Sequence, residues 1–260
     1  MVPARRSGSE WRELPPSRRV AEELRHAILV GELVPGALLP SERELARTYG
    51  IARNTARQAI AILQADGLVD AQHGRGVFVR QARPLLLRAH DRYARRRREA
   101  GVAPFRAEAE AQGHAARAEV TAVARVPAPA WVAERLSLAE GEPVLLRRTR
   151  YLADDEPVQL SHTYLPLAIA DGTALAEEVP AAGGIYAALD ELGHRLARID
   201  EHVTARMPLP EEIDALVLAA GVPVIDMRRT GYDERGTAIE ATHTLLAADR
   251  NALTFDLPVD

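Results

Sequence analysis

Residues 41–67 contain two short helical patterns separated by one glycine, Gly50, and few folds contain such a segment. Ser41 and Glu44 have the spacing of a capping box, in which each side chain satisfies a backbone N–H group of the other residue. The helix that they begin ends at Gly50, a residue that adopts the left-handed conformation of a helix C-terminus without strain. A second helix is predicted from Arg53 to Asp66. The segment therefore predicts two helices that meet at a tight turn.

The second of these helices separates apolar from polar side chains. Its apolar residues repeat at helical spacing, and its other faces carry arginine, asparagine and glutamine. Arginine suits the edge of guanine, and asparagine and glutamine suit the edge of adenine. The pattern therefore predicts a helix-turn-helix that reads DNA. Its outward-facing candidates are Arg53, Asn54, Arg57 and Gln58.

Two short strands are predicted after this helix, at residues 68–72 and 77–80. The connection between them is His73-Gly74-Arg75-Gly76, and its two glycines permit a tight tip that brings the backbone and Arg75 close to DNA phosphates. We expect a further helix to begin near Arg18 and to end at Gly31. Residues 1–16 are predicted to form a disordered tail, and residues 17–80 to form a winged helix-turn-helix domain.

Charge is distributed unevenly along the chain. The net charge is −4, from 33 basic residues, all of them arginine, and 37 acidic residues. The first 100 residues carry 19 arginines against 11 acidic residues, a net of +8, whereas the remainder carries 14 against 26, a net of −12. A basic N-terminal part is typical of contact with a polyanion, but the run 95–98 also fits a solvated linker. Charge alone leaves both interpretations open.

Two residue types are missing, and their absence excludes several kinds of site. The chain has no cysteine and no lysine, so it cannot form a disulfide, a cysteine-ligated zinc site, a cysteine nucleophile, a Schiff base or a lysine-dependent phosphate loop. Neither an H-E-x-x-H nor a G-x-S-x-G motif occurs. No apolar run approaches 18 residues, and the N-terminus lacks a secretory pattern. We expect a cytoplasmic protein with no catalytic residue, cofactor, metal or membrane contact.

The second half of the chain predicts hairpins interleaved with short helices, an α+β domain with an antiparallel sheet. Residues 81–104 are predicted to be a linker and residues 105–260 the domain itself, with hairpin turns at residues 154–155 and 233–236. The expected strands are 118–126, 144–152, 158–164, 196–205, 224–233 and 238–246, and the expected helices are 129–136, 185–192 and 210–220.

Four segments closely resemble the GntR family of bacterial transcription regulators: residues 39–46, 53–59, 67–69 and 73–79. The resemblance implies that the second helix supplies Arg43 to phosphate or base, and that the recognition helix supplies Arg53, Thr55 and Arg57. It also implies that the wing enters the minor groove with His73 and Gly74. One position differs from the family pattern: Ala52 is at the N-cap of the recognition helix, where many relatives have serine or threonine. The loss of that cap costs roughly 1 kcal/mol.

The remainder resembles the UTRA ligand-sensing domain of the HutC branch of GntR regulators, a domain similar in fold to chorismate lyase. The resemblance is carried by residues 141–144, 148–150, 161–166 and 221–224, among others. It implies a pocket for a small polar metabolite, with arginines holding anionic or hydroxyl oxygens, a glutamate taking hydroxyls and a tyrosine lining the site. The effector-binding candidates are Arg148, Arg150, Ser161, Thr163, Tyr164, Tyr186 and Glu240.

Arg148 and Arg150 lie two apart on a predicted strand, so they face the same way and can converge on one oxyanion. The alternative is that both are exposed partners of nearby acids. Three departures restrain the choice of effector: Gly184 and Leu246 stand where sugar-phosphate sensors have serine and tyrosine, and Ser161 stands where an acid is common. A phosphosugar, an acidic metabolite and a more apolar metabolite all remain open.

Together these patterns predict a homodimeric regulator, more often a repressor in this family, that binds a palindromic operator in double-stranded DNA. A small-molecule effector in the second domain is expected to reorient the DNA-binding heads through residues 81–104. Two alternatives remain. A chorismate-lyase-like enzyme fused to a DNA-binding head predicts product formation, and a nucleoid-type binder without a ligand predicts little sequence preference.

Overall fold

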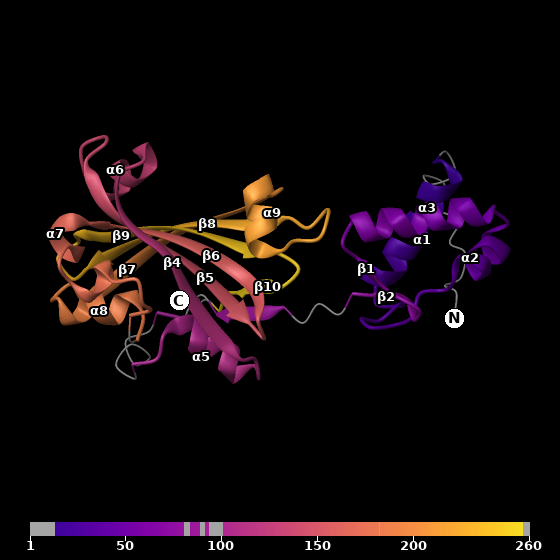
Figure 1. Ribbon diagram of the computed structural model, residues 1–260, viewed down its shortest axis with the longest axis horizontal. Helices are drawn as coiled ribbons and strands as arrows, with labels where there is room; N and C mark the ends of the chain where they lie inside the picture. Colours follow the sequence, from indigo (N-terminus) through magenta and orange to yellow (C-terminus); the bar gives the residue numbers. More distant parts are fainter. Residues whose placement is uncertain (1–13, 81–83, 89–91, 94–100, 182, 257–260) are drawn as a thin grey trace. The chain divides into compact units, whose positions relative to one another are not determined.

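The computed structural model describes residues 14–80, 84–88, 92–93, 101–181 and 183–256. The chain divides into two compact units, one formed by the N-terminal residues up to 83 and one formed by most of the remainder (Figure 1). Residues 1–13 of the predicted tail, and the arginine run at 95–98, lie outside the described residues. Within the described part, no helix has the length and apolarity that a membrane span requires.

The N-terminal unit consists of three helices and a small hairpin, and it confirms the predicted winged helix-turn-helix. Ser41 and Glu44 form the capping box, with Ser41 N donating to Glu44 Oε2 at 2.8 Å and Glu44 N donating to Ser41 Oγ at 3.3 Å. Gly50 ends this helix with a φ of 64°. The elements are α1 (Pro16–Leu29), α2 (Glu42–Tyr49), α3 (Arg53–Ala65), β1 (Val69–Gln72) and β2 (Gly76–Val79). Their core includes Val20, Leu24, Leu45, Ala56, Leu63 and Val79.

The C-terminal unit is built on a six-stranded antiparallel sheet of order β4-β5-β6-β9-β8-β7, which confirms the α+β class. Its strands are β4 (Ala116–Pro127), β5 (Pro143–Ala153), β6 (Glu156–Pro166), β7 (Leu196–Arg206), β8 (Val224–Asp233) and β9 (Ala238–Ala247). Its helices are α5 (Pro104–Ala111), α6 (Ala130–Leu136), α7 (Leu167–Ala170), the 3-10 helix η2 (Ala174–Ala176), α8 (Ile185–Glu191) and α9 (Pro210–Leu216).

The turn between β5 and β6 lies where the sequence predicts it. Asp154 and Asp155 have φ values of 51° and 64°. Two-residue hairpins of type I′ need a positive φ at both central residues, and aspartate tolerates that conformation better than most side chains. Asp154 is held further by the Ala115 N–H, which donates to its Oδ1 at 2.8 Å. The turn sets the pairing next to it, and a β-bulge between Tyr151 and Leu152 shifts the register by one residue along the rest of β5 and β6.

The two faces of the sheet pack against different helices. Helices α6 and α9 lie on one side of the sheet in Figure 1, and α5 and α8 lie on the other. On the first side, Val132 of α6 packs with Val144 of β5. On the second, Leu189 of α8 packs with Leu145 of the same strand. We call these the α6/α9 face and the α5/α8 face.

Part of the segment predicted as a linker belongs to the C-terminal unit. Strand β3 (Leu85–Arg88) pairs in parallel with β10 (Asn251–Thr254), and Leu85 and Leu87 are buried while Leu86 is exposed. The sequence shows the leucine run but not its partner, because β10 lies more than 160 residues later in the chain. Helix α9 is shorter than predicted, since Val217 at its C-terminus takes a φ of 50°.

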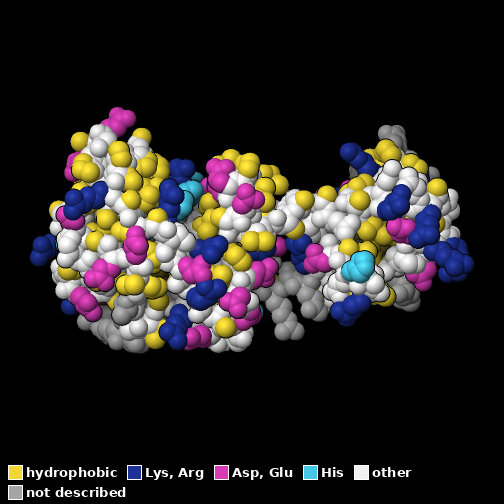
Figure 2. All heavy atoms as spheres, viewed as in Figure 1, with side chains coloured by type: hydrophobic (Ala, Val, Ile, Leu, Met, Phe, Trp, Pro, Cys, Tyr) yellow, Lys and Arg dark blue, Asp and Glu magenta, His cyan; other side chains and the backbone are white. Residues whose placement is uncertain are grey.

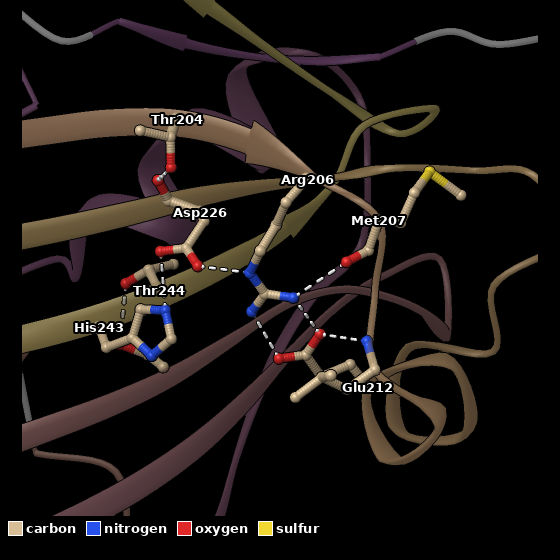
Figure 3. A network of polar contacts seen from close by, with 9 residues as sticks. Thr204, Arg206, Met207, Glu212, Asp226, His243 and Thr244 are labelled. Carbon is tan, nitrogen blue, oxygen red and sulfur yellow. Dashed lines mark hydrogen bonds and ion pairs between the residues drawn. The ribbon is translucent and has the colours of Figure 1, made fainter.

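Arg206 attaches helix α9 to the α6/α9 face (Figure 3), and Arg250 donates to Leu216 O at the C-terminus of the same helix at 2.6 Å. Arg206 of β7 donates from Nε to Asp226 Oδ2 on β8, and from both terminal nitrogens to the carboxylate of Glu212 on α9, each at 2.7 Å. His243 Nε2 of β9 lies 2.8 Å from Asp226 Oδ1. The network joins three strands and one helix.

We expect this network to lose strength in acid. Burial opposes the ionisation of Asp226, but the Arg206 hydrogen bond and the charge of His243 hold its pKa below the ordinary value, and the Arg206 hydrogen bond lowers the pKa of Glu212. A lowered folded-state pKa gives stability that is complete above the unfolded values, about 3.9 and 4.3, and that is lost as pH falls through the folded ones. Arg206→Met should therefore cost about 2 kcal/mol at pH 7 and much less near pH 3, as measured by urea unfolding.

Arg135→Met is the matched control, because Arg135 pairs with Asp200 at 2.9 Å across an exposed surface. Exposed pairs contribute little, so this variant should unfold within about 0.5 kcal/mol of the wild type at both pH values. An equal loss for Arg206→Met at pH 3 and pH 7 would show that the carboxylates do not carry the effect.

Candidate functional site

One face of α3 presents the DNA-binding candidates to solvent. Arg53, Asn54, Arg57 and Gln58 are exposed and Thr55 is half-buried, whereas the alternate face of the helix packs into the core through Ala56 and Ala59. The helical period of 3.6 residues causes this separation, since the apolar residues recur every three or four positions. Arg43 is exposed on the neighbouring helix α2.

The polar side chains of α3 already contact one another and α2. Arg53 Nε donates to Glu42 Oε2 at 2.8 Å, although 77% of the arginine side chain is exposed, and Arg57 donates to Asn54 Oδ1. No side chain caps the start of α3 at Ala52. The first N–H groups of the helix are thus without a side-chain acceptor, and a helix start of this kind favours an anion such as a DNA phosphate.

The tip between β1 and β2 carries the remaining DNA-binding candidates. His73, Gly74 and Arg75 are all exposed, and Gly74 has a φ of 72°, a conformation that glycine adopts without a steric cost. The Arg75 guanidinium lies 5.6 Å from the centre of the Phe78 ring. The nine candidates therefore occur on α2, on α3 and on the hairpin of a single unit.

A small cavity lies on the α5/α8 face of the sheet in the C-terminal unit. It has a volume of about 70 Å³, and we call it the inner cavity. Side chains of β5, β6, β8 and β9 form one side of it, and α8 together with residues 92–93 and 103–105 forms the other. The polar or aromatic residues that line it are Arg92, Tyr93, Phe105, Tyr151, Gln159, Ser161, Thr163, Tyr186, Arg229 and Thr244.

A buried ion pair lies at the inner cavity. Arg229 Nε donates to Glu240 Oε1 at 2.9 Å, and the Tyr186 hydroxyl donates to the same carboxylate oxygen. Burial raises the pKa of Tyr186 well above its ordinary value, so the phenol stays a hydrogen-bond donor at neutral pH. Burial alone would lower the pKa of Arg229, but Glu240 together with Tyr186, Tyr93 and Glu201 raises that pKa.

Two further side chains of the inner cavity come from the segment predicted as a linker. The Tyr93 ring meets the Tyr186 ring edge-on, with centroids 5.4 Å apart, and its hydroxyl accepts from Arg229. Arg92 Nε lies 3.4 Å from Glu108 Oε2 of α5. Both arginines of the inner cavity therefore have a carboxylate partner.

Three of the seven predicted effector residues line the inner cavity, and a fourth, Glu240, contacts the lining residues Arg229 and Tyr186. The three are Ser161, Thr163 and Tyr186. Glu240 is completely buried and is occupied by Arg229, Tyr186 and the Thr242 hydroxyl. The carboxylate is thus engaged inside the protein, rather than available to ligand hydroxyls as the resemblance implies.

The other three candidates, Arg148, Arg150 and Tyr164, do not line the inner cavity, and the convergence of the two arginines on an effector oxyanion stays a prediction. Arg148 pairs in register with His162 on the α6/α9 face, where burial and then the Arg148 charge lower the pKa of His162 to about 4. Arg150 donates to Glu119 Oε2 at 2.7 Å and 2.9 Å. Tyr164 packs edge-on against Trp131 of α6. Arg148 and Arg150 do share a face of β5. Because helices pack on both faces of the sheet, the alternation of side chains could not show which face borders the cavity.

Sequence reasoning missed Gln159, Thr244 and Arg229. A signal for the first two exists: Gln159, Ser161 and Thr163 are polar at every second position of β6, and Thr242 and Thr244 repeat this on β9. Polar side chains that face the interior in this way indicate a site rather than a core. No comparable signal distinguishes Arg229 from Arg228. Within the described ranges, no group of three or more histidines and acids could hold a metal ion.

Comparison with protein families matches both units. The model of bacterial regulatory proteins of the gntR family matches residues 16–79, and the model of the UTRA domain matches residues 111–251, more than half of the chain. The chain belongs to the GntR family of bacterial regulators. A GntR domain followed by a UTRA domain makes this GntR-family protein a DNA-binding transcriptional regulator that senses a small molecule.

Individual relatives cover nearly the whole of this GntR-family chain. An HTH-type transcriptional regulator of Streptomyces coelicolor is 30% identical over 96% of this chain and 93% of its own length. The HTH-type transcriptional repressor NagR of Bacillus subtilis is 27% identical over 89% and 90%. The crystal structure of PhnF from Mycobacterium smegmatis, 26% identical, covers 93% of this chain and 100% of that one with a TM-score of 0.60.

Replacing recognition-helix arginines should reduce base discrimination. Arg53→Ala or Arg57→Ala should lower the preference for a selected operator over a scrambled duplex by about 1–3 kcal/mol, because a bidentate base contact is lost. Arg75→Ala should weaken binding to both duplexes evenly if the wing arginine reaches phosphate alone. Fluorescence anisotropy at fixed salt measures both quantities.

Arg18→Ala is the control, since this exposed α1 arginine lies outside α2, α3 and the wing. Removal of its charge should change both affinities less than removal of Arg57. If Arg57→Ala weakens the operator and the scrambled duplex by the same factor, its assignment as a base contact is wrong.

Proposed function

We propose that this GntR-family protein is a homodimeric repressor of the HutC subfamily, acting in the cytoplasm on a palindromic operator. The names of two relatives support repression: NagR, and the PhnF of Mycolicibacterium smegmatis, which is 30% identical over 84% of both chains. One helix-turn-helix addresses one half-site, so a two-fold dimer matches an inverted repeat. The proposed DNA contacts are Arg43, Arg53, Asn54, Thr55, Arg57, Gln58, His73, Gly74 and Arg75.

The effector is proposed to bind in the inner cavity, with Ser161, Thr163 and Tyr186 among its contacts. We also propose the domain bounds. The DNA-binding unit consists of residues 17–80, and the sensor unit begins at β3 rather than at residue 105. No comparison favours a chorismate-lyase-like enzyme, since the relatives are named as regulators.

One helix connects the inner cavity to the strand that follows the DNA-binding unit, and this observation carries the proposed regulation. Phe105 of α5 lines the inner cavity. Gln112, which caps the C-terminus of the same helix, accepts through Oε1 from Leu86 N at 2.9 Å and donates through Nε2 to Leu86 O at 3.1 Å. Glu108 Oε1 accepts from Arg88 N at 3.0 Å. A ligand that displaces Phe105 would therefore shift β3, and through it the segment that leads to α1–α3.

The operator should be an inverted repeat. Repeated selection from a random DNA pool with the full-length chain should enrich two copies of one half-site in opposite orientation, with centres about one helical turn apart or a multiple of it. Analytical ultracentrifugation of the complex should give two protein chains per duplex. Enrichment of a single, unrepeated half-site bound by one chain would overturn the dimer proposal.

Breaking the contact between α5 and β3 should separate ligand binding from regulation. Gln112→Ala removes both hydrogen bonds to Leu86 but no residue of the inner cavity. For a metabolite that raises the melting temperature of the wild type, the variant should keep its affinity within about twofold. The ligand-induced change in operator affinity should fall at least threefold, since coupling energies of about 1–3 kcal/mol depend on such contacts.

Arg106→Ala serves as a control on the same helix, because Arg106 pairs with Glu110 at the exposed surface. This variant should keep the full ligand effect on the operator. If Gln112→Ala also keeps it, the coupling does not pass through this contact. If the wild type shows no ligand effect at all, the sensor proposal fails for that metabolite.

A further inference from the structure

A second, larger cavity adjoins the inner cavity on the same unit. It has a volume of about 460 Å³, and we call it the outer cavity. The two cavities share Ala103, Phe105 and Tyr151 as lining residues, and the Phe105 and Tyr151 rings contact each other with centroids 4.9 Å apart. The outer cavity continues along side chains that are almost all apolar, such as Val102, Ala116, Ala118, Pro180 and Ala181. Such a lining favours an alkyl chain or a ring and offers few hydrogen bonds.

In the inner cavity, by contrast, the hydrogen-bonding side chains other than the ion-paired Arg92 and Arg229 are uncharged. Ser161, Thr163 and Thr244 contribute hydroxyls from two adjacent strands. Gln159 is 3% exposed, and its side-chain oxygen Oε1 is buried without a hydrogen-bond partner. Buried polar atoms are nearly always paired, so this acceptor indicates a donor that a ligand supplies. A volume of about 70 Å³ has room for roughly five water-sized groups.

The charges at the inner cavity are already balanced. Arg229 is paired with Glu240 at 2.9 Å, and Arg92 lies 3.4 Å from Glu108. A third carboxylate, Glu201, lies 3.4 Å from the Tyr93 hydroxyl. A phosphate or carboxylate placed among these groups would add a buried charge with no partner, which is unfavourable. At the outer cavity, Arg106 and Arg117 are likewise paired, with Glu110 and Asp155.

We propose that the effector is an uncharged amphiphile with a small head that carries hydroxyl or amide donors and an apolar body. The head occupies the inner cavity and donates to Gln159, and the body lies in the outer cavity beside Phe105 and Tyr151. This inference rests on the proposed function, which assigns effector binding to this site. It names the ligand class that this chain's own residues favour, and it excludes sugar phosphates.

Four probes that share parts test the proposal: 1-O-octylglycerol, octyl phosphate, glycerol and glycerol 3-phosphate, each measured against the full-length chain by isothermal titration below any micelle concentration. Octylglycerol should bind at least tenfold more tightly than octyl phosphate, and the two compounds without a chain should bind more weakly than either. Tighter binding of octyl phosphate, or of glycerol 3-phosphate, would overturn the proposal.

Two variants locate the head and the body of the ligand. Gln159→Leu should weaken octylglycerol at least fivefold without lowering the melting temperature, because it removes a buried acceptor that has no partner in the free protein. Ala118→Phe should fill the outer cavity and weaken octylglycerol at least tenfold. Ala124→Phe, on an exposed part of the same strand, should leave the affinity unchanged. Equal weakening by Ala118→Phe and Ala124→Phe, or no effect of Gln159→Leu, would contradict the assigned position.

The same titrations distinguish failure of the ligand class from failure of the proposed function. If octylglycerol binds as expected but leaves operator affinity unchanged, the ligand class stands and the regulatory role of the site is contradicted. If glycerol 3-phosphate alters operator affinity and Ser161→Ala or Tyr186→Phe weakens its binding, the regulatory site stands and the uncharged-ligand proposal fails.

Discussion

The alternation of side chains across the six-stranded sheet, combined with the register of its strands, decides which chemistry meets in the C-terminal unit. A shift of one residue exchanges the two faces of a strand. In the observed register, Thr149, Ser161, Thr244 and Met227 follow one another across β5, β6, β9 and β8 on the α5/α8 face. Arg148, His162, His243 and Arg228 follow one another on the opposite face. The α5/α8 face therefore brings hydroxyls, the Gln159 amide and the ion-paired Arg229 to the inner cavity, and Arg148 and Arg228 lie on the other face.

Buried charge in this unit is used to hold structure together. Arg229 and Glu240 neutralise each other beside the inner cavity, and Arg206 joins α9 to the sheet through Asp226 and Glu212. A buried ion pair is tolerated when each charge has a partner and further hydrogen bonds, as both clusters do here. These carboxylates are thus engaged within the protein. Helix α5 lines the inner cavity through Phe105, and its C-terminal cap residue Gln112 binds β3.

The uneven charge of the chain agrees with the division of labour between its two units. The N-terminal unit, residues 1–83, carries 13 arginines against 9 acidic residues, a net of +4, and its arginines on α2, α3 and the wing include exposed ones; Figure 2 shows basic side chains on the surface of this unit. The acidic surplus of the remainder opposes contact of the sensor with the phosphate backbone. Arginine is the cation in both units, since its planar guanidinium can form hydrogen bonds with base edges and ion pairs with buried carboxylates.

Local patterns in the sequence determined the helix-turn-helix, the wing, the strands of the sheet and the turn at Asp154, because caps, glycines and hydrophobic periods act over a few residues. The resemblance to the UTRA domain, rather than a local pattern, predicted Ser161, Thr163 and Tyr186 as effector residues, and all three line the inner cavity. The tertiary structure alone decided that β3 pairs with β10, that Arg92 and Tyr93 reach the inner cavity, and that Arg229 rather than Arg148 lies beside it. The physical reason is that each of these depends on strand register and on contacts between residues far apart in the chain. Periodicity shows that two residues share a face, but only packing shows what that face meets.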